Sequence, residues 1–549
     1  MTATLVGPGA GRAGRHAEPL AGTGRLLRLA LRRDRVRLAV WLLGVTGLTV
    51  YAAAVLDTTY PTAADRQARA EVMGNPAAVM LSGPGYGLDD YTLGAMVANE
   101  VAFTALVAAA IMSVLLVVRH TRAEEEAGRT ELVGAAAVGR RAPLTAALVL
   151  VGLADAAIAL LVAAGLAGAG FAAADSLAIG LGIGLTGVVF AGVAAVTAQL
   201  TAYGRAASGA ALGVLAAAAV VRGAGDVLRA GGSALSWLSP IAWAQQTRAY
   251  VDLRWWPLAL SAVLAVLLVR AAYALVGRRD VGAGLLPPRG GPADASARLA
   301  GVTALAARLQ RAAVLGWGIA VLLLGVVYGS IMDSVTDLLA ENERVGDAVA
   351  RIGGGGSLLD AFAATVGLYL SLLVAAFAVS STLRVHAEEV AGRTALVLAG
   401  AVDRRRLLAG SLAVTIGAAV LVTVGAGLGA GLAAAAVTGD AGLLGRLLAA
   451  VLAPLPAVLV VTGVAAVLVA VLPRWSVLAW AVLAWVVLIG LFGPLLRLPE
   501  WVVRLSPFGW VPAVPAEPVD PVPLAVLTLL AAALLGLALA GFRRRDLAG

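Results

Sequence analysis

The sequence predicts an all-α polytopic membrane protein of about twelve transmembrane helices, arranged as two parallel six-helix repeats. Apolar residues make up 60% of the 549 positions and charged residues only 13%, whereas soluble domains carry roughly 25% charged residues. Apolar stretches of about 20 residues recur along the whole chain. Segments of the first half also reappear, in the same order, in the second half. The bilayer is therefore the main solvent, and counting helices replaces counting soluble domains.

Each predicted span is an apolar run long enough, or nearly so, to cross about 30 Å of hydrocarbon. The first half contains six such runs, at residues 38–56, 101–118, 144–166, 177–200, 209–221 and 257–275. The second half contains six more, at residues 314–332, 361–379, 407–433, 447–471, 477–491 and 524–539.

Composition divides the chain into four segments. Residues 1–22 are rich in Gly, Ala and Arg and lack the apolar core of a signal peptide, so they are expected to form a disordered cytoplasmic tail. Residues 23–280 form the first six-helix half. Residues 281–296 are rich in Gly and Pro and predict a cytoplasmic linker. Residues 297–549 form the second half.

The distribution of charge predicts the orientation in the membrane. Placing both termini in the cytoplasm puts most of the 41 basic residues, all of them Arg, on the inner side and most acids outside, as the positive-inside rule requires. With a composition typical of a GC-rich genome, this indicates a multi-pass protein of a bacterial inner membrane. Leu pairs and Arg alternate over Arg25–Arg35, which favours an amphipathic helix in the cytoplasmic interface over a solvated linker helix. A weaker version lies at 304–311.

An internal repeat supports the division into halves. Arg122–Arg141 aligns without gaps to His386–Arg405, and most positions are identical. Three further correspondences follow in the same order. Gly192–Val196 recurs as Gly463–Val467, and Arg278-Arg279-Asp280 recurs as Arg544-Arg545-Asp546. Between them, Leu238-Ser239-Pro240 with Trp243 recurs as Leu505-Ser506-Pro507 with Trp510. Because each half has an even number of spans, the two repeats are parallel and not inverted.

The repeated segment between the second and third spans of each half is the strongest indication of function in the sequence. Each copy has the order acids, Gly-Arg-Thr, apolar residues and an Arg cluster. One interpretation is that the Arg residues anchor the loop inside the cell and the acids form a solvated face. That interpretation does not explain the ordered Gly-Arg-Thr core. The alternative is a short helix across the membrane surface, presented to a cytoplasmic partner that contacts both halves in equivalent ways.

At this point the sequence resembles the type-2 ATP-binding-cassette permeases, and among them the fused twelve-span bacterial exporters of polyketide antibiotics (tetronasin-like). The resemblance rests on RHTRAEEEAGRTELVGAAAVGRR from Arg119, AEEVAGRTALVLAGAVDRR from Ala387, Asn75-Pro76-Ala77 with Gly83-Pro84, and LSPIAWAQQTRAYVDLRWWP from Leu238 to Pro257. It runs through nearly the whole chain.

The resemblance implies that the two segments are coupling helices, each docked on one nucleotide-binding subunit, and that an interfacial elbow helix precedes each half. The implied coupling residues are Glu124, Glu125, Gly128, Arg129 and Thr130 in the first half, and Glu388, Glu389, Gly392, Arg393 and Thr394 in the second. The acidic residues are the implied contacts. Val390 and Ala395 replace Glu126 and Glu131, which puts equal coupling of the two halves in doubt.

The composition also excludes several kinds of chemistry. There is no Cys, and the three His residues are far apart in sequence, so a metal site is not expected. A P-loop needs a Lys that reaches the nucleotide phosphates, and the chain has none. We therefore expect no enzymatic activity and no cofactor here, with ATP and Mg²⁺ bound by two copies of a partner ATPase. Membrane lipid and a hydrophobic or amphipathic compound are the other expected partners; nucleic acid is not.

The candidates for the substrate path are charged residues within or just after predicted spans and two Trp residues at span ends. Asp155 lies mid-span and is either functional or a hydrogen-bonded structural group. The residue at the equivalent position of the second half is the apolar Ala419. Arg222 and Asp226 are spaced to pair on a helix, either within the bilayer or just outside it. Trp243 and Trp510 flank the outer ends of spans, where they anchor the interface or gate the path.

Two other functions compete with export driven by ATP. A secondary transporter with parallel repeats is expected to have coupling carboxylates near the midplane, and only Asp155 is a candidate. A polytopic membrane enzyme is expected to have a catalytic constellation near one face, and only Asp89 and Asp90 beside Tyr91 suggest one.

Overall fold

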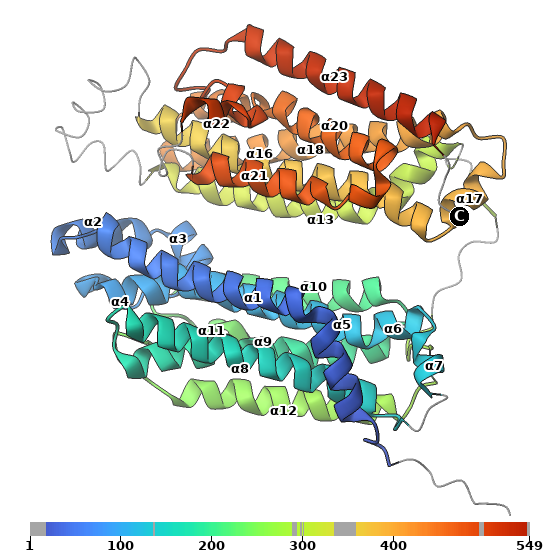
Figure 1. The fold of residues 1–549 in the computed structure, drawn as a ribbon. Helices are drawn as coiled ribbons and strands as arrows, with labels where there is room; N and C mark the ends of the chain where they lie inside the picture. Colours follow the sequence, from blue (N-terminus) through green and yellow to red (C-terminus); the bar gives the residue numbers. More distant parts are fainter. Residues whose placement is uncertain are drawn as a thin grey trace, which may run out of the picture. The chain divides into compact units, whose positions relative to one another are not determined.

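The computed structural model describes residues 18–134, 138–280, 282–287, 294–296, 299, 301–333, 358–492 and 499–545. Most of the predicted tail, part of the predicted linker and Asp546 lie outside these residues. Within them the chain is helical, without strands, so the prediction of an all-α polytopic membrane protein is confirmed. The chain divides into two compact units, residues 1–291 and 292–549, and each is described by itself (Figure 1).

The first unit contains six long apolar helices, joined by short ones. The long helices are α1 (Thr23–Thr59), α5 (Ala102–His120), α8 (Ala142–Gly168), α9 (Ala173–Leu200), α10 (Gly204–Leu228) and α12 (Trp256–Val276). The short ones are α2 (Ala63–Met73), α3 (Pro76–Leu81), η1 (Leu88–Asp90), α4 (Leu93–Met96), the π-helical turn η2 (Val97–Val101), α6 (Arg122–Glu126), α7 (Arg129–Gly134), η3 (Ser236–Leu238) and α11 (Pro240–Gln245). Figure 1 shows α2, α3 and α4 at one end of this unit and α6 and α7 at the other.

The second unit repeats this order. Its helices are α13 (Val302–Ser330), α16 (Leu358–Val390), α17 (Arg393–Leu398), α18 (Arg404–Thr438), α19 (Gly442–Leu452), α20 (Leu455–Val471), η4 (Pro473–Trp475), α21 (Leu478–Phe492), α22 (Glu500–Arg504), η5 (Pro507–Trp510) and α23 (Pro521–Arg544). Among the described residues, eleven helices are long and apolar enough to cross a membrane, and α21 is a shorter apolar one. The predicted span at 447–471 is divided between α19 and α20 near Pro454.

Equivalent glycines pack the same helix pair in each unit. In the first, a Cβ added at Gly192 of α9 would lie 2.7 Å from the Leu268 side chain of α12. In the second, a Cβ at Gly463 of α20 would lie 2.8 Å from the Leu534 side chain of α23. Because only glycine permits this approach, the repeat seen in the sequence is also a repeat of packing.

The predicted elbow helix is present in the first unit. Helix α1 has non-helical angles at Asp34 (φ −104°, ψ 15°), which separates its first turns from the span (Figure 1). The buried Asp34 carboxylate accepts hydrogen bonds from Arg37 (2.9 Å) and from Arg119 (3.1 Å), and it contacts His120 Nε2 at 2.6 Å. These contacts hold the bend against the end of α5.

The second unit differs from the prediction. Residues 304–311 form the first turns of α13, which continues to Ser330 without a separate elbow. Gln310 precedes Trp317 by the same distance as Asp34 precedes Trp41. Its neutral amide contacts the hydroxyls of Ser381 (2.5 Å) and Ser411 (3.3 Å). Since these contacts are compatible with a straight helix, the weaker amphipathic pattern does not produce a bend.

Candidate functional site

The repeated Gly-Arg-Thr begins a six-residue helix in both units. In the first, Gly128 has φ +70° and joins α6 to α7; in the second, Gly392 has φ +72° and precedes α17. A Cβ at either glycine would meet nothing within 4 Å, so glycine is required by the left-handed backbone and not by space. The turn redirects the chain away from the preceding span.

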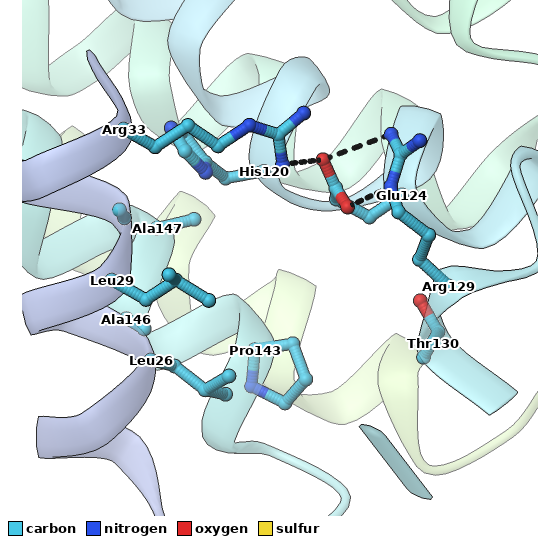
Figure 2. Close-up of a pocket in the computed structure, with 11 residues that line it drawn as sticks. Leu26, Leu29, Arg33, His120, Glu124, Arg129, Thr130, Pro143, Ala146 and Ala147 are labelled. Carbon is cyan, nitrogen blue, oxygen red and sulfur yellow. Dashed lines mark hydrogen bonds and ion pairs between the residues drawn. The ribbon is translucent and has the colours of Figure 1, made fainter. Parts of the chain in front are cut away.

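The glutamate before each turn binds the arginine after it. Arg129 Nε donates to Glu124 at 2.5 Å, and Arg393 Nε donates to Glu388 at 2.5 Å. The Glu124 hydrogen bond raises the pKa of Arg129. In the first unit Glu124 also accepts from Arg33 of the elbow at 2.6 Å, so it lies between two guanidinium groups (Figure 2).

A second pair connects each segment to the end of the last span in its unit. Arg279 donates two hydrogen bonds to Glu125, at 2.8 and 2.6 Å. Arg545 likewise donates two to Glu389, at 2.8 and 2.5 Å. Both carboxylates are largely buried, with 13% and 2% of their side chains exposed. Bidentate guanidinium–carboxylate pairs combine charge with fixed geometry, so the segment and the last span are held in one orientation.

The Arg cluster that follows the short helix completes the connection. Arg140 donates to the Arg279 carbonyl oxygen, and Arg404 donates to the Arg545 carbonyl oxygen at 2.6 Å. Arg279 and Arg545, whose side chains bind the glutamates, are thus also held through their backbone carbonyl oxygens. The two units reproduce this arrangement although much of their remaining sequence differs.

The two copies differ in how they contact the neighbouring helices. The buried Arg122 guanidinium donates to the carbonyl oxygens of Ala198 (2.9 Å) and Ala283 (3.1 Å), whereas the equivalent residue is His386. Glu126 accepts from the backbone N–H of Gly204 at 2.9 Å, at the start of α10. Its counterpart Val390 is 68% exposed. The first segment is therefore attached to more of its unit than the second.

Side chains beyond each turn differ in exposure. Thr394 is buried and Thr130 is half-buried, so both help to pack the short helix. Leu396 of α17 is 77% exposed, so α17 presents apolar surface beyond the turn. The sequence suggested the glutamates as the partner contacts, but the structure places them in pairs within the chain. On the short helices themselves, Glu131 and Leu396 are exposed.

Asp155 is fully buried between three helices of the first unit. Its carboxylate accepts from the Ser113 hydroxyl of α5, at 3.0 Å to either oxygen, and a Cβ added at Gly187 of α9 would lie 2.3 Å from it. At the offsets of the repeat these three residues correspond to Phe377, Ala419 and Val458, all buried in the apolar core of the second unit. The hydrogen-bonded Ser113 and Asp155, with Gly187 beside them, are thus replaced by three apolar side chains in the second unit.

This packing predicts a specific rescue. Gly187→Ala is expected to lower the melting temperature by several degrees, since overpacking costs about 1–3 kcal/mol, and Asp155→Ala in the same chain is expected to restore most of it. The measurement is thermal unfolding of the detergent-solubilised protein. Gly152→Ala on α8, where an added Cβ meets nothing within 4 Å, is the control. Equal shifts for Gly152→Ala and Gly187→Ala would contradict the assignment.

Arg222 and Asp226 lie within the first unit, at the end opposite α6 and α7. The fully buried Arg222 guanidinium pairs with Asp226 at 3.3 Å, donates to Gln245 Oε1 at 3.3 Å and to the Met80 carbonyl oxygen, and stacks over the Phe103 ring. Asp226 also accepts from Ser236 at 2.7 Å. The pair is therefore internal to the protein and joins α10 to α3, α5, η3 and α11.

Trp243 and Trp510 have equivalent structural contacts. The Trp243 indole donates to the Trp237 carbonyl oxygen at 2.8 Å, and the Trp510 indole donates to the Arg504 carbonyl oxygen at 2.7 Å. Each indole joins the short helix on which it lies, α11 or η5, to the short helix before it, η3 or α22. In the first unit, the residues suggested by the sequence therefore lie in three places. The repeated segment is at one end of the unit, the Arg222 network and Trp243 are at the other end, and Asp155 is buried between helices.

Several residues of the site were not suggested as functional by the sequence. Arg279 and Arg545 were noted only as landmarks of the repeat, although their recurrence together with Glu125 and Glu389 was a usable signal. Asp34 carried no such signal, because two of its partners, Arg119 and His120, are far away in sequence.

Comparison with known proteins identifies relatives of this chain. A family model described as the C-terminal domain of the multidrug efflux system permease Rv1217c matches two stretches, residues 24–276 and 299–543. The multidrug efflux system permease protein Rv1217c of Mycobacterium tuberculosis is 40% identical over 556 residues, covering 100% of both chains. The two matched stretches each contain one copy of the repeated segment with its paired glutamates.

Proposed function

Because this chain belongs to the family of multidrug efflux system permeases, we propose that it is the membrane-spanning subunit of an ATP-binding-cassette exporter. In this proposal a separate subunit binds ATP and Mg²⁺ and hydrolyses the nucleotide, and this chain is a transport subunit, not an enzyme. Its substrates are hydrophobic or amphipathic drug-like compounds, as expected of the tetronasin-like permeases that its motifs resemble.

The observation that supports this proposal best is the recurrence of one connection in both units. In each unit a bidentate pair, Glu125 with Arg279 or Glu389 with Arg545, joins the helix end just before the Gly-Arg-Thr turn, in α6 or α16, to the end of the last span. A loop that only oriented the protein in the membrane would need the Arg cluster but not a matched carboxylate. Two equivalent connections suit a partner that is present twice.

The mechanism follows from these connections. A cytoplasmic ATPase subunit docks on α7 and another on α17, where Leu396 offers apolar surface. ATP binding and hydrolysis displace the short helix. The Glu124–Arg129 or Glu388–Arg393 pair passes the displacement across the turn to α6 or α16, and the bidentate pair transmits it to α12 or α23. Rigid-body motion of packed helices then opens the path alternately to the two sides of the membrane. The ends that carry α7 and α17 are cytoplasmic, as are both termini, in a bacterial cell membrane.

The test is the composition of the complex. Purified alone, the chain is expected to hydrolyse no ATP. Isolated from native membranes, it is expected to carry two copies of a P-loop ATPase per permease, measured by native mass spectrometry. A homodimer of the permease without an ATPase, or ATP hydrolysis by the purified chain, would overturn the proposal.

A further inference from the structure

A small pocket lies between the elbow helix and α8 in the first unit. Its volume is about 90 Å³. Its floor is apolar and includes Leu26 and Leu29 of the elbow and Ala146 and Ala147 of α8. Its rim carries Arg33, and with it Glu124 and Arg129 of the coupling region (Figure 2). The pocket therefore has an apolar part and a charged part, as an amphipathic ligand requires.

The bend at Asp34 accounts for the pocket. Because the elbow turns at Asp34, its first turns diverge from the line of the span and leave space beside α8. In the second unit the straight α13 passes close to α18, and a Cβ added at Gly410 would lie 2.9 Å from Thr303 Oγ1. Leu309 stands where Arg33 stands in the first unit. Both the space and the cation are features of the first unit.

The charge at the rim favours an anion. Arg33 and Arg129 share the single carboxylate of Glu124, which leaves one positive charge in excess. His120 at the rim is held by Asp34, and Asp34 is already paired with Arg37 and Arg119. A phosphodiester carries one negative charge and matches the guanidinium group in geometry.

The apolar floor distinguishes a lipid from a free anion. Leu29 lines the pocket and is 59% exposed, so the apolar surface continues from the floor to the outside of the elbow. An amphipathic helix of this kind lies at the level of lipid headgroups, and basic pockets at the cytoplasmic side of membrane helices bind anionic headgroups. The pocket is then within reach of lipids and not of the aqueous phase alone.

We propose that this pocket binds one anionic phospholipid, with its phosphate at Arg33 and Arg129 and part of an acyl chain against Leu26 and Leu29. The phosphate competes with Glu124 for the two guanidinium groups. Occupancy therefore changes the link between the elbow and the coupling segment, and the lipid acts on the first unit only. Lipid binding does not depend on the proposed transport function, so the two can fail separately.

The experiment is native mass spectrometry of the full chain in detergent, with added phosphatidylglycerol or phosphatidylcholine. The wild-type protein is expected to retain one phosphatidylglycerol in preference to phosphatidylcholine. Arg33→Gln is expected to weaken that retention about fivefold, the effect of one basic residue near an anionic lipid. Ala146→Leu, which fills the pocket without changing charge, is expected to weaken retention of the same molecule.

Arg32→Gln is the matched control, because Arg32 is exposed on the same helix and does not line the pocket. Equal losses for Arg32→Gln and Arg33→Gln, or equal retention of the two lipids by the wild-type protein, would overturn the proposal. So would displacement of phosphatidylglycerol by inorganic phosphate at constant ionic strength, which indicates a free-anion site. Should Ala146→Leu fail to fold, the comparison of the two Arg variants decides alone.

Discussion

Arg279→Glu is expected to reduce transport at least about tenfold, while the protein still inserts in the membrane. The substitution removes two charge-assisted hydrogen bonds to Glu125 and places two carboxylates against each other. Such bonds contribute about 1.5–3 kcal/mol each, and about 1.4 kcal/mol corresponds to a factor of ten. If the pair transmits motion, ATP hydrolysis by the partner continues but no longer drives transport. The measurement is drug uptake into inverted vesicles, with ATP hydrolysis recorded in parallel.

The exchange of the two residues is the stronger part of this test. Glu125→Arg combined with Arg279→Glu restores the opposite charges of this pair, but it removes the partner of the buried Arg122, which donates to Glu125 at 2.9 Å, so transport is expected to recover in part. Arg278→Glu is the control, because Arg278 is adjacent, exposed and equally charged, and it is expected to have little effect. Arg545→Glu, with Arg544→Glu as its control, repeats the experiment in the second unit. If Arg278→Glu and Arg279→Glu were equally damaging, the effect would belong to charge near the membrane and not to the pair.

The contacts around the bidentate pair differ between the two units. Arg279 Nε donates to Gln199 at 2.7 Å, whereas the position equivalent to Gln199 is Ala470 and Arg545 Nε is buried without a hydrogen-bond partner among the described residues. Glu126 also ties the first segment to α10 through Gly204.

The long helices could be predicted because their signal is local. A run of apolar residues is sufficient to define a span, and the predicted spans coincide with the helices to within a few residues in most cases. The predicted span at 209–221 is one exception, because the helix is longer than the apolar run at both ends. Helix α10 extends from Gly204 to Leu228, and the apolar run appeared to end at Val221 because Arg222 and Asp226 follow. Their charges are compensated by residues far away in sequence, which a local window does not detect.

The candidate site was predicted in outline and not in its contacts. Duplication within the chain singled out the Gly-Arg-Thr segments, and the positive φ at Gly128 and Gly392 explains why glycine recurs. The family resemblance implied that Glu125 and Glu389 contact a partner. Only the fold reveals that the ends of α12 and α23 bring Arg279 and Arg545 to them.

Arg222→Met is expected to be among the most destabilising single substitutions in the first unit. It leaves the buried Asp226 without its cation and leaves Gln245 Oε1 and the Met80 carbonyl oxygen without the donors they now have. Breaking one side of a buried pair costs about 3–5 kcal/mol. The expected result is a large fall in melting temperature and in the yield of monodisperse protein, measured by fluorescence-detected size exclusion after heating.

The companion variants separate the charge from the packing at this position. Adding Asp226→Asn to Arg222→Met removes the uncompensated carboxylate and is expected to recover part of the stability, because an internal pair can often be replaced as a whole. Arg222→Lys keeps the charge, but a single ammonium group cannot reproduce the fork of guanidinium contacts, so its stability is expected to lie in between.

Arg229→Met, at an exposed position just beyond α10, removes the same charge from the surface and is expected to have little effect. If Arg229→Met and Arg222→Met lowered the melting temperature equally, or if the double variant were no better than Arg222→Met, the pair would not be what joins α10 to α3 and α11.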